Sequence, residues 1–367
     1  MAIKKKLKVL HCPVVALYQP YLYVKGLREA GFKADYMAFN FKVDGWLGRD
    51  CDFDLEIDNS KGLEVEKTRE VDFLIYATDH YDIFHFHGSF GLLHPGHSLW
   101  GGLDELRFLK RMDKKIVMSW WGCDLRTEEV DMRHKYSACS ECDKDIKAYC
   151  RSAIKREVLK KAMRYADVHL SNGDLAASYE KIRWIDNAID CDEWRPLERS
   201  EIPEEFRLPE TENLRVYHSF GNSELRGDVK GSAQIREAVE RLKAEGYKVE
   251  FIFFDKVPNR DLKYYQAQAD IVVDQLRCGW HGSTAVECLS LGKPVITYIR
   301  PEVEAIVPHE HPLINANIDN IYEVLKGLVQ DQERIREVGK RSREYAIRYH
   351  DYRVIAGQLV SIYRSVG

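Results

Sequence analysis

Short apolar runs alternate along the chain with longer segments in which apolar residues recur every three or four positions. The first pattern is typical of buried β-strands and the second of amphipathic helices. In the first half of the chain, the predicted strands are Lys8–Cys12, Ile83–His87, Lys115–Trp121 and Val168–Ser171, and the predicted helices are Tyr21–Gly31, Leu103–Met112 and Ala153–Ala166. Strands that alternate with helices favour a parallel sheet with helices on both faces.

The alternation breaks once and then restarts. The segment Asp192–Leu214 holds three prolines and many charged residues, which is typical of a connection between domains. Beyond it, the predicted strands are Arg215–Phe220, Tyr247–Phe254, Asp270–Leu276 and Pro294–Ile299, with helical patterns between them and over Asn320–Val366. We therefore expect an α/β fold of two doubly wound, Rossmann-like parallel-sheet domains that face a cleft.

Composition narrows the class of protein. With 367 residues the chain is long enough for two domains, and its net charge of −4 argues against a general nucleic-acid surface. The lysines at 4–6 precede an apolar run that is broken by Lys8, His11 and Pro13. This pattern predicts a first strand rather than a signal peptide. The longest stretch without Lys, Arg, Asp or Glu is Ile83–Leu103, which is too polar to span a membrane. We expect a cytoplasmic protein, with at most peripheral contact at the inner face of the membrane.

Four of the nine cysteines are grouped in a polar segment. Nine is an odd number, and without an export signal it argues against a disulfide scaffold. Cys123, Cys139, Cys142 and Cys150 include one C-x-x-C pair, and four thiolates would suit a structural zinc ion that orders this segment. Reduced, partly buried thiols or a redox pair are the alternatives.

The stretch "CGWHGSTAVECLSLGKPVI" predicts a site for phosphate. A predicted strand ends at Leu276, Gly279 and Gly282 permit a tight turn, and a helix begins near Ser283 and Thr284. The bare backbone amides at a helix start carry roughly half a positive charge and bind phosphate groups. One such contact stabilises an anion by only about 0.3–2 kcal/mol, so a diphosphate needs cationic side chains as well.

Two further features could complete that site. The loop "GNSELRGDVKGS" follows a predicted strand and carries Arg226 and Lys230, a pair of cations suited to a dianionic leaving group. The alternative is an ordinary surface loop. Glu287 lies on the inward face of an otherwise apolar helix, where it needs hydrogen-bond donors, and the two hydroxyls of a ribose would supply them. The alternative is a glutamate bonded within the core.

These segments carry a resemblance to a known family. The stretches "YHSFGNSELRGDVKGSAQIREAVERL" and "ADIVVDQLRCGWHGSTAVECLSLGKPVITYIR" resemble the group-1, family-4 glycosyltransferases of the GT-B fold. In the first half, "YDIFHFHGSF", "KKIVMSWWGCDLR", "RYADVHLSNGDL" and "WIDNAIDCDEWRP" look like the strand ends and the hinge segment of that family. The resemblance spans roughly residues 8 to 365.

The resemblance implies that different parts of the chain bind the acceptor and the donor. Residues 1–196 would bind the acceptor, residues 197–348 would bind the nucleotide-sugar donor, and a helix within 349–367 would pack back on the first domain. The implied reaction moves a sugar from a UDP- or GDP-sugar to a hydroxyl of a glycan, lipid-linked or small-molecule acceptor, with retention and without a metal, in glycan or glycoconjugate biosynthesis. Apart from the possible structural zinc, no cofactor is implied.

The resemblance also implies roles for single residues. Arg226 and Lys230 would hold the diphosphate and assist its departure, and Glu287 would bind the ribose. The loop "DKVPN", with Val257, would lie against the base. The turn and helix start at Gly279, Gly282, Ser283 and Thr284 would contact the donor.

The chain departs from the family pattern in two places. The family commonly has an acid eight positions before the equivalent of Glu287, and that position is Gly279 here. His281 and Trp280 are the nearest side chains that could contact the donor sugar instead, and we count His281 among the candidate catalytic residues.

The second departure concerns the acceptor side. Trp121 stands where many members of the family have a histidine, although Asp124 and Arg126 remain. His85 and His87 are the available substitutes, with His87 a candidate catalytic residue, and packing beneath the cleft is the alternative for both. Two other functions stay open: an epimerase or hydrolase that acts on a sugar nucleotide, and a partner protein that binds the nucleotide sugar without catalysis.

Overall fold

The computed structural model describes residues 7–14, 18–39, 51–55, 63–93, 102–220, 227–254 and 257–367. The chain forms two compact units. The first comprises Met1–Thr127, Ala148–Ala188 and Tyr352–Gly367, and the second comprises Glu128–Lys147 and Ile189–Asp351. Among the described residues, no helix combines the length and the apolar character that crossing a membrane requires.

The first unit is built on a parallel sheet with the strand order β3-β2-β1-β4-β5-β6-β7. Its strands are β1 (Lys8–Val14), β2 (Lys33–Ala38), β3 (Phe53–Asp54), β4 (Ile83–His87), β5 (Lys115–Ser119), β6 (Val168–Ser171) and β7 (Ile182–Trp184). Strand β4 is buried along its whole length, as expected for a central strand that helices cover on both faces. The strand order reverses between β1 and β4, and ligands bind doubly wound sheets beyond the strand ends at such a point.

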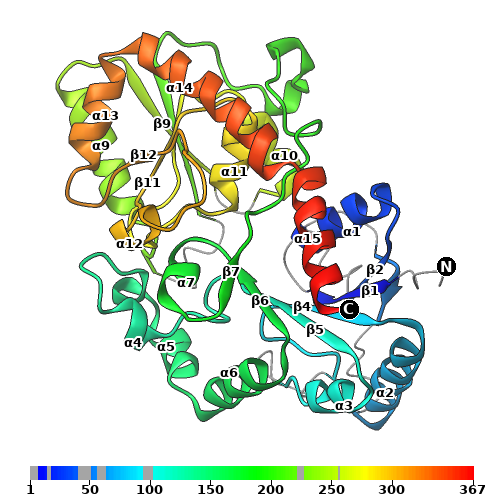
Figure 1. Ribbon diagram of the computed structural model, residues 1–367. Coiled ribbons are helices and arrows are strands. Elements are labelled where there is room, and N and C mark those ends of the chain that lie inside the picture. Colours follow the sequence, from blue (N-terminus) through cyan, green and yellow to red (C-terminus); the bar gives the residue numbers. More distant parts are fainter. Residues whose placement is uncertain are drawn as a thin grey trace. The chain divides into compact units, whose positions relative to one another are not determined.

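Helices pack around this sheet (Figure 1). They are α1 (Gln19–Glu29), α2 (Leu63–His80), α3 (Glu105–Arg111), α6 (Ala153–Tyr165), α7 (Gly173–Ser178) and α15 (Tyr352–Val366), and α5 (Lys144–Cys150) ends in this unit. Although α15 is the last helix of the chain, it packs directly on α1. A Cβ atom at Gly26 would lie 2.7 Å from the Cβ of Ala356, so glycine at this position allows the two helices to approach closely.

The second unit has a parallel sheet with the order β12-β11-β10-β8-β9. Its strands are β8 (Leu214–Ser219), β9 (Val249–Phe254), β10 (Ile271–Val273), β11 (Val295–Thr297) and β12 (Ile314–Asn315). Its helices are α4 (Glu128–Asp131), α9 (Ser232–Ala244), α10 (Asn259–Gln266), α11 (Ser283–Ser290), α12 (Pro301–Glu304), α13 (Ile321–Val329) and α14 (Gln332–Tyr345). The strand order reverses between β8 and β10. The prediction of two Rossmann-like parallel-sheet domains, the GT-B fold, is confirmed.

One segment lies apart from its sequence neighbours. Residues 128–147 belong to the second unit, although the sequence analysis included them in a first domain of residues 1–196. A buried ion pair explains this placement: Asp131 Oδ1 lies 2.6 Å from Arg300 Nη2, and both side chains are almost fully buried. Exposed contacts of Lys135 and Tyr136 with Asp319 add to it.

Candidate functional site

A buried carboxylate, Asp274, connects two of the predicted phosphate-binding elements of the second unit. Lys230 follows β8 and Asp274 follows β10, so both lie where the strand order reverses. Lys230 Nζ is 3.1 Å from Asp274 Oδ1 and donates to the carbonyl oxygen of Ser219 at 3.3 Å. Asp274 Oδ2 accepts from the backbone amide of Gly282 at the start of α11. The lysine and the helix start are thus linked through an aspartate that the sequence did not single out, and their role in binding a diphosphate stays a prediction.

Local hydrogen bonds hold the described part of the loop that carries Lys230, from Gly227 onward. Gly231 has a φ of +80°, a left-handed conformation that glycine adopts without strain, and the carboxylate of Asp228 accepts from the amides of Ser232 and Ala233 at the start of α9. Beneath the loop, the ring of His218 contacts the carbonyl oxygen of Val273 and the hydroxyl of Ser232, both at 2.8 Å. Arg226, the other predicted cation, lies outside the described residues.

Glu287 is buried on α11 and is already hydrogen-bonded. One carboxylate oxygen accepts from Asn259 Nδ2 at 2.9 Å and the other from Gln266 Nε2 at 3.0 Å, so both donors come from α10. Burial raises the pKa of Glu287 to about 7, against the lowering effect of the two amide donors. This arrangement fits the alternative of a glutamate bonded within the core. Contact with a ribose stays a prediction, since a carboxylate accepts about four hydrogen bonds.

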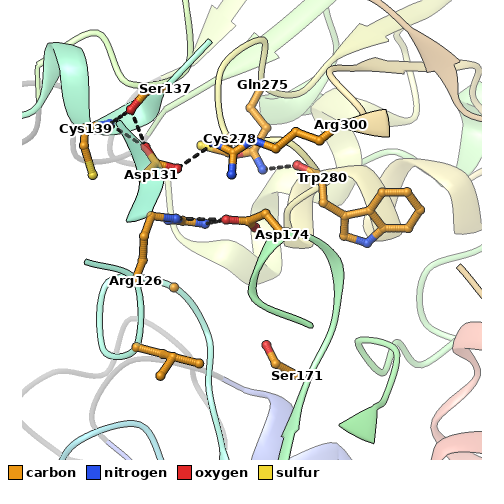
Figure 2. Close-up of polar contacts among 12 residues, drawn as sticks. Arg126, Asp131, Ser137, Cys139, Ser171, Asp174, Gln275, Cys278, Trp280 and Arg300 are labelled. Atoms are coloured by element: carbon orange, nitrogen blue, oxygen red, sulfur yellow. Dashed lines mark hydrogen bonds and ion pairs between the residues drawn. The ribbon is translucent and has the colours of Figure 1, made fainter. Parts of the chain in front are cut away.

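The turn before α11 explains why one predicted position is a glycine. Gly279 has a φ of +85°, and a Cβ atom there would lie 2.6 Å from Cδ of Arg300. Arg300 passes this glycine and reaches Asp131, whose other carboxylate oxygen accepts from Ser137 Oγ and from the amide of Cys139 (Figure 2). The space beside Gly279 is therefore filled by the arginine stem, and an acidic side chain at position 279 would collide with it.

The remaining predicted donor-side residues lie around α11 and α10. Ser283 and Thr284 begin α11 as expected, and its N-cap residue, Gly282, provides no side-chain cap. Val257 lies two residues before the start of α10. His281 is buried, and its ring centroid lies 4.6 Å from that of Trp280 and 5.6 Å from that of His350.

In the first unit, three histidines lie together at the point where the strand order reverses. His11 on β1 pairs in register with His85 on β4, and His87 follows two residues later on the same face. His11 Nδ1 lies 3.0 Å from His87 Nε2. Burial lowers the pKa of His11 to about 3, and it lowers the pKa values of His85 and His87 well below their usual range. All three are therefore neutral at pH 7.

Two further groups from the sequence analysis lie nearby in the chain. The indole of Trp121 stacks on His87, with ring centroids 6.0 Å apart. The carboxylate of Asp124 accepts from the amides of Trp121, Gly122 and Leu125, and burial raises its pKa. Arg126 pairs with Asp174 at 2.6 Å, a contact also drawn in Figure 2. Asp124 and Arg126 therefore hold this part of the first unit together.

Three histidines lie close enough together to be compared with a metal site, whereas the four grouped cysteines are divided between the two units. Among the described residues, the one group of His, Cys, Asp and Glu whose ligand atoms all lie within 4.8 Å of one another is His11, His85 and His87. Cys123 and Cys150 belong to the first unit, and Cys139 and Cys142 to the second. A four-thiolate zinc site would thus draw on both units, and it stays a prediction. Within the first unit, the buried Lys155 places Nζ 3.6 Å from Cys150 Sγ.

Comparison with solved structures identifies proteins of the same fold. No protein-family model and no curated protein matches the chain. HepE of Anabaena in complex with UDP and glucose is 13% identical, with 98% of this chain and 100% of that chain covered and a TM-score of 0.62. Sucrose-phosphate synthase of Thermosynechococcus elongatus is 14% identical, with 98% and 99% covered and a TM-score of 0.65. UDP-GlcNAc 2-epimerase of Neisseria meningitidis bound to UDP-GlcNAc is 12% identical, with 98% and 100% covered and a TM-score of 0.57. These likenesses extend over nearly the whole chain and establish its two-domain GT-B architecture.

Proposed function

We propose that the protein is a glycosyltransferase that moves a sugar from a nucleoside-diphosphate sugar to a hydroxyl of an acceptor, with retention. The observation that carries the proposal is the group formed by Lys230, Asp274 and the start of α11 at the switch point of the second sheet. The likeness of the fold to HepE, whose structure contains UDP and glucose, supports UDP as the first nucleotide to test.

The group has donors left for a diphosphate. An ammonium has three N–H donors, and among the described residues Lys230 uses two of them, on Asp274 and Ser219. The first amides of α11 beyond Gly282 have no acceptor within the helix, and the N-cap residue, Gly282, has no side chain to cap them. One lysine N–H and these amides would bind phosphate oxygens, while Asp274 holds both elements in place.

In the proposed reaction, the bond between the anomeric carbon and the diphosphate oxygen breaks as the acceptor oxygen bonds to that carbon. The acceptor proton leaves with the nucleoside diphosphate or passes to solvent. Negative charge therefore builds on the departing diphosphate, next to Lys230 and the start of α11. Donors fixed in advance at the place where charge develops lower the barrier more than donors that must reorient.

Titration with nucleotides tests the donor site. Purified protein would be titrated calorimetrically with UDP, GDP and ADP, and then with the corresponding sugars. We expect the double variant Lys230→Met/Asp274→Asn to bind UDP about 10- to 100-fold more weakly, because one charge-assisted hydrogen bond contributes about 1.5–3 kcal/mol. The Asn side chain can still accept from the amide of Gly282. Unchanged affinity in this variant would place the diphosphate elsewhere.

Lys263→Met is a matched control. Its side chain is buried to nearly the same extent as that of Lys230 and pairs with Glu193 in the same unit, so it should leave UDP affinity unchanged. Product analysis then separates the candidate functions. Transfer to a hydroxyl acceptor supports the proposal, an epimerised or hydrolysed sugar nucleotide supports the second candidate, and binding without turnover supports a non-catalytic partner. Gly279 in place of an acid favours that last alternative.

A further inference from the structure

The three histidines of the first unit belong to a continuous series of hydrogen bonds. Tyr363 OH, from α15, lies 2.6 Å from His85 Nδ1 and 3.1 Å from His11 Nε2. His85 Nε2 lies 2.7 Å from Ser119 Oγ, and His11 Nδ1 lies 3.0 Å from His87 Nε2. The series therefore runs Ser119–His85–Tyr363–His11–His87, and all five side chains are buried.

Counting protons leaves two arrangements of this series. Each neutral imidazole has one N–H and one lone pair, and the tyrosine hydroxyl has one proton to share between two imidazoles. If Tyr363 accepted from both histidines, its buried hydroxyl proton would have no partner among the described residues, so it donates to one histidine and accepts from the other. If it donates to His11, then His11, His85 and His87 all carry their proton on Nδ1. If it donates to His85, all three carry it on Nε2. The three rings must therefore adopt the same tautomer.

The ring geometry favours this series over a metal site. The lone pairs of an imidazole lie in the plane of its ring. The rings of His85 and His87 are stacked, with centroids 4.5 Å apart and planes inclined by 21°, and those of His11 and His87 are also inclined by 21°. The lone pairs of His85 and His87 therefore run side by side instead of converging on one ion.

One end of the series lacks a hydrogen-bond partner among the described residues. His87 Nδ1 is buried and has no hydrogen-bond partner among the residues that the structure describes. The same is true of the indole Nε1 of Trp121, whose ring lies almost parallel to that of His87. An unpaired polar atom in a buried position is costly, so a bound group that satisfies His87 Nδ1 would be stabilised.

We propose that Ser119, His85, Tyr363, His11 and His87 form one chain of coupled tautomers whose end, His87 Nδ1, binds a hydroxyl of a neutral ligand. A hydroxyl that donates to His87 Nδ1 selects the Nε2–H form in all three histidines. Conversion from the other form releases one proton to solvent from His87 Nδ1 and takes one up from solvent at Ser119 Oγ, so the net charge does not change. The identity of this ligand rests on the proposed function, in which the acceptor supplies the hydroxyl.

Nitrogen NMR of histidine-labelled protein tests the proposal. Long-range ¹H–¹⁵N correlations report which ring nitrogen carries the proton, and we expect the same tautomer for His11, His85 and His87 in the wild-type protein. Tyr363→Phe should release His85 from the other two rings. Tyr81→Phe removes a partly buried hydroxyl of the same unit, which is bonded to Asp35, and should change none of them. Different tautomers among the three wild-type rings would overturn the proposal, and that measurement needs no variant.

Two titrations complete the test. Glycerol and methyl α-glucoside serve as neutral hydroxyl probes. We expect them to shift His87 and to increase the Nε2–H form of all three rings, and absence of any shift would overturn the hydroxyl assignment. Binding of stoichiometric Zn²⁺ to the three rings would replace the tautomer chain with a metal site. UDP binding measured on the same samples tests the donor site separately, so either proposal can fail alone.

Discussion

The buried ion pair between Asp131 and Arg300 gives a quantitative prediction. Their side chains are 1% and 2% exposed, and their charged atoms lie 2.6 Å apart. Asp131→Asn removes one charge and takes away the carboxylate that lies 2.6 Å from the buried guanidinium of Arg300. Loss of one partner from a buried pair typically costs about 3–5 kcal/mol, because the remaining charge must be desolvated alone. We expect a loss of that size in the free energy of unfolding of the second unit.

Denaturant titration followed by tryptophan fluorescence would measure this loss, and hydrogen exchange would locate it. The amide of Cys139 donates to Asp131, so it should exchange faster in the variant. Asp319→Asn is the control, because its pair with Lys135 joins the same segment to the same unit but is exposed. The control should show no measurable change, since solvent and salt screen exposed pairs.

A second variant separates charge burial from packing. In Asp131→Asn/Arg300→Met no unpaired charge is left, so the double variant should be more stable than Asp131→Asn alone. Two results would refute the reasoning: a loss below about 1 kcal/mol for Asp131→Asn, as expected of a surface pair, or a double variant that is no more stable than Asp131→Asn.

Three further predictions concern the second unit and the cysteines. Burial raises the pKa of Glu287 from 4.5 to about 7. The folded protein therefore keeps this proton to higher pH than the unfolded chain, and stability that is fully present below pH 4.5 falls by about 3 kcal/mol as the pH rises through 7. Glu287→Gln should remove this part of the pH dependence, as measured by denaturant titrations between pH 4 and 8. Gly279→Ala should cost about 1–3 kcal/mol in thermal unfolding because of its positive φ and the contact with Arg300. Gly327→Ala, in the open on α13, should be neutral or should stabilise by about 0.5–1 kcal/mol. If the four grouped cysteines bind zinc, atomic emission should find it in stoichiometric amount in purified protein and much less of it in Cys142→Ser.

The sequence alone was sufficient to predict the features that a local pattern of residues encodes. Alternation of apolar runs and amphipathic segments predicted both parallel sheets, because each strand and helix shows its own period. The helix start at Ser283 followed from the glycines before it and the apolar residues after it. Asp274 was missed because it was counted inside a strand over Asp270–Leu276, whereas β10 ends at Val273. A charged residue at the end of a run of β-branched residues was the signal that could have found it.

The remaining features depend on contacts between distant parts of the chain. Asp131 and Arg300 are 169 positions apart, and Tyr363 meets His11 across 352 positions. No local period encodes such pairs, because they arise only when the strand order and the helix packing are fixed. For the same reason, the sequence could propose a ribose for Glu287 but could not anticipate that Asn259 and Gln266 reach it first.

The chain passes from one unit to the other after Thr127, Lys147, Ala188 and Asp351, so neither unit is a continuous piece of polypeptide. A gene fragment that stops at residue 196 would keep Asp131 without Arg300 and would lose the whole of α15, including the hydroxyl that joins His85 to His11. Cutting the protein at its proline-rich connection should therefore yield two damaged halves instead of two working modules. The first unit can therefore be completed only after α15, whose 15 residues are synthesised late, has been added.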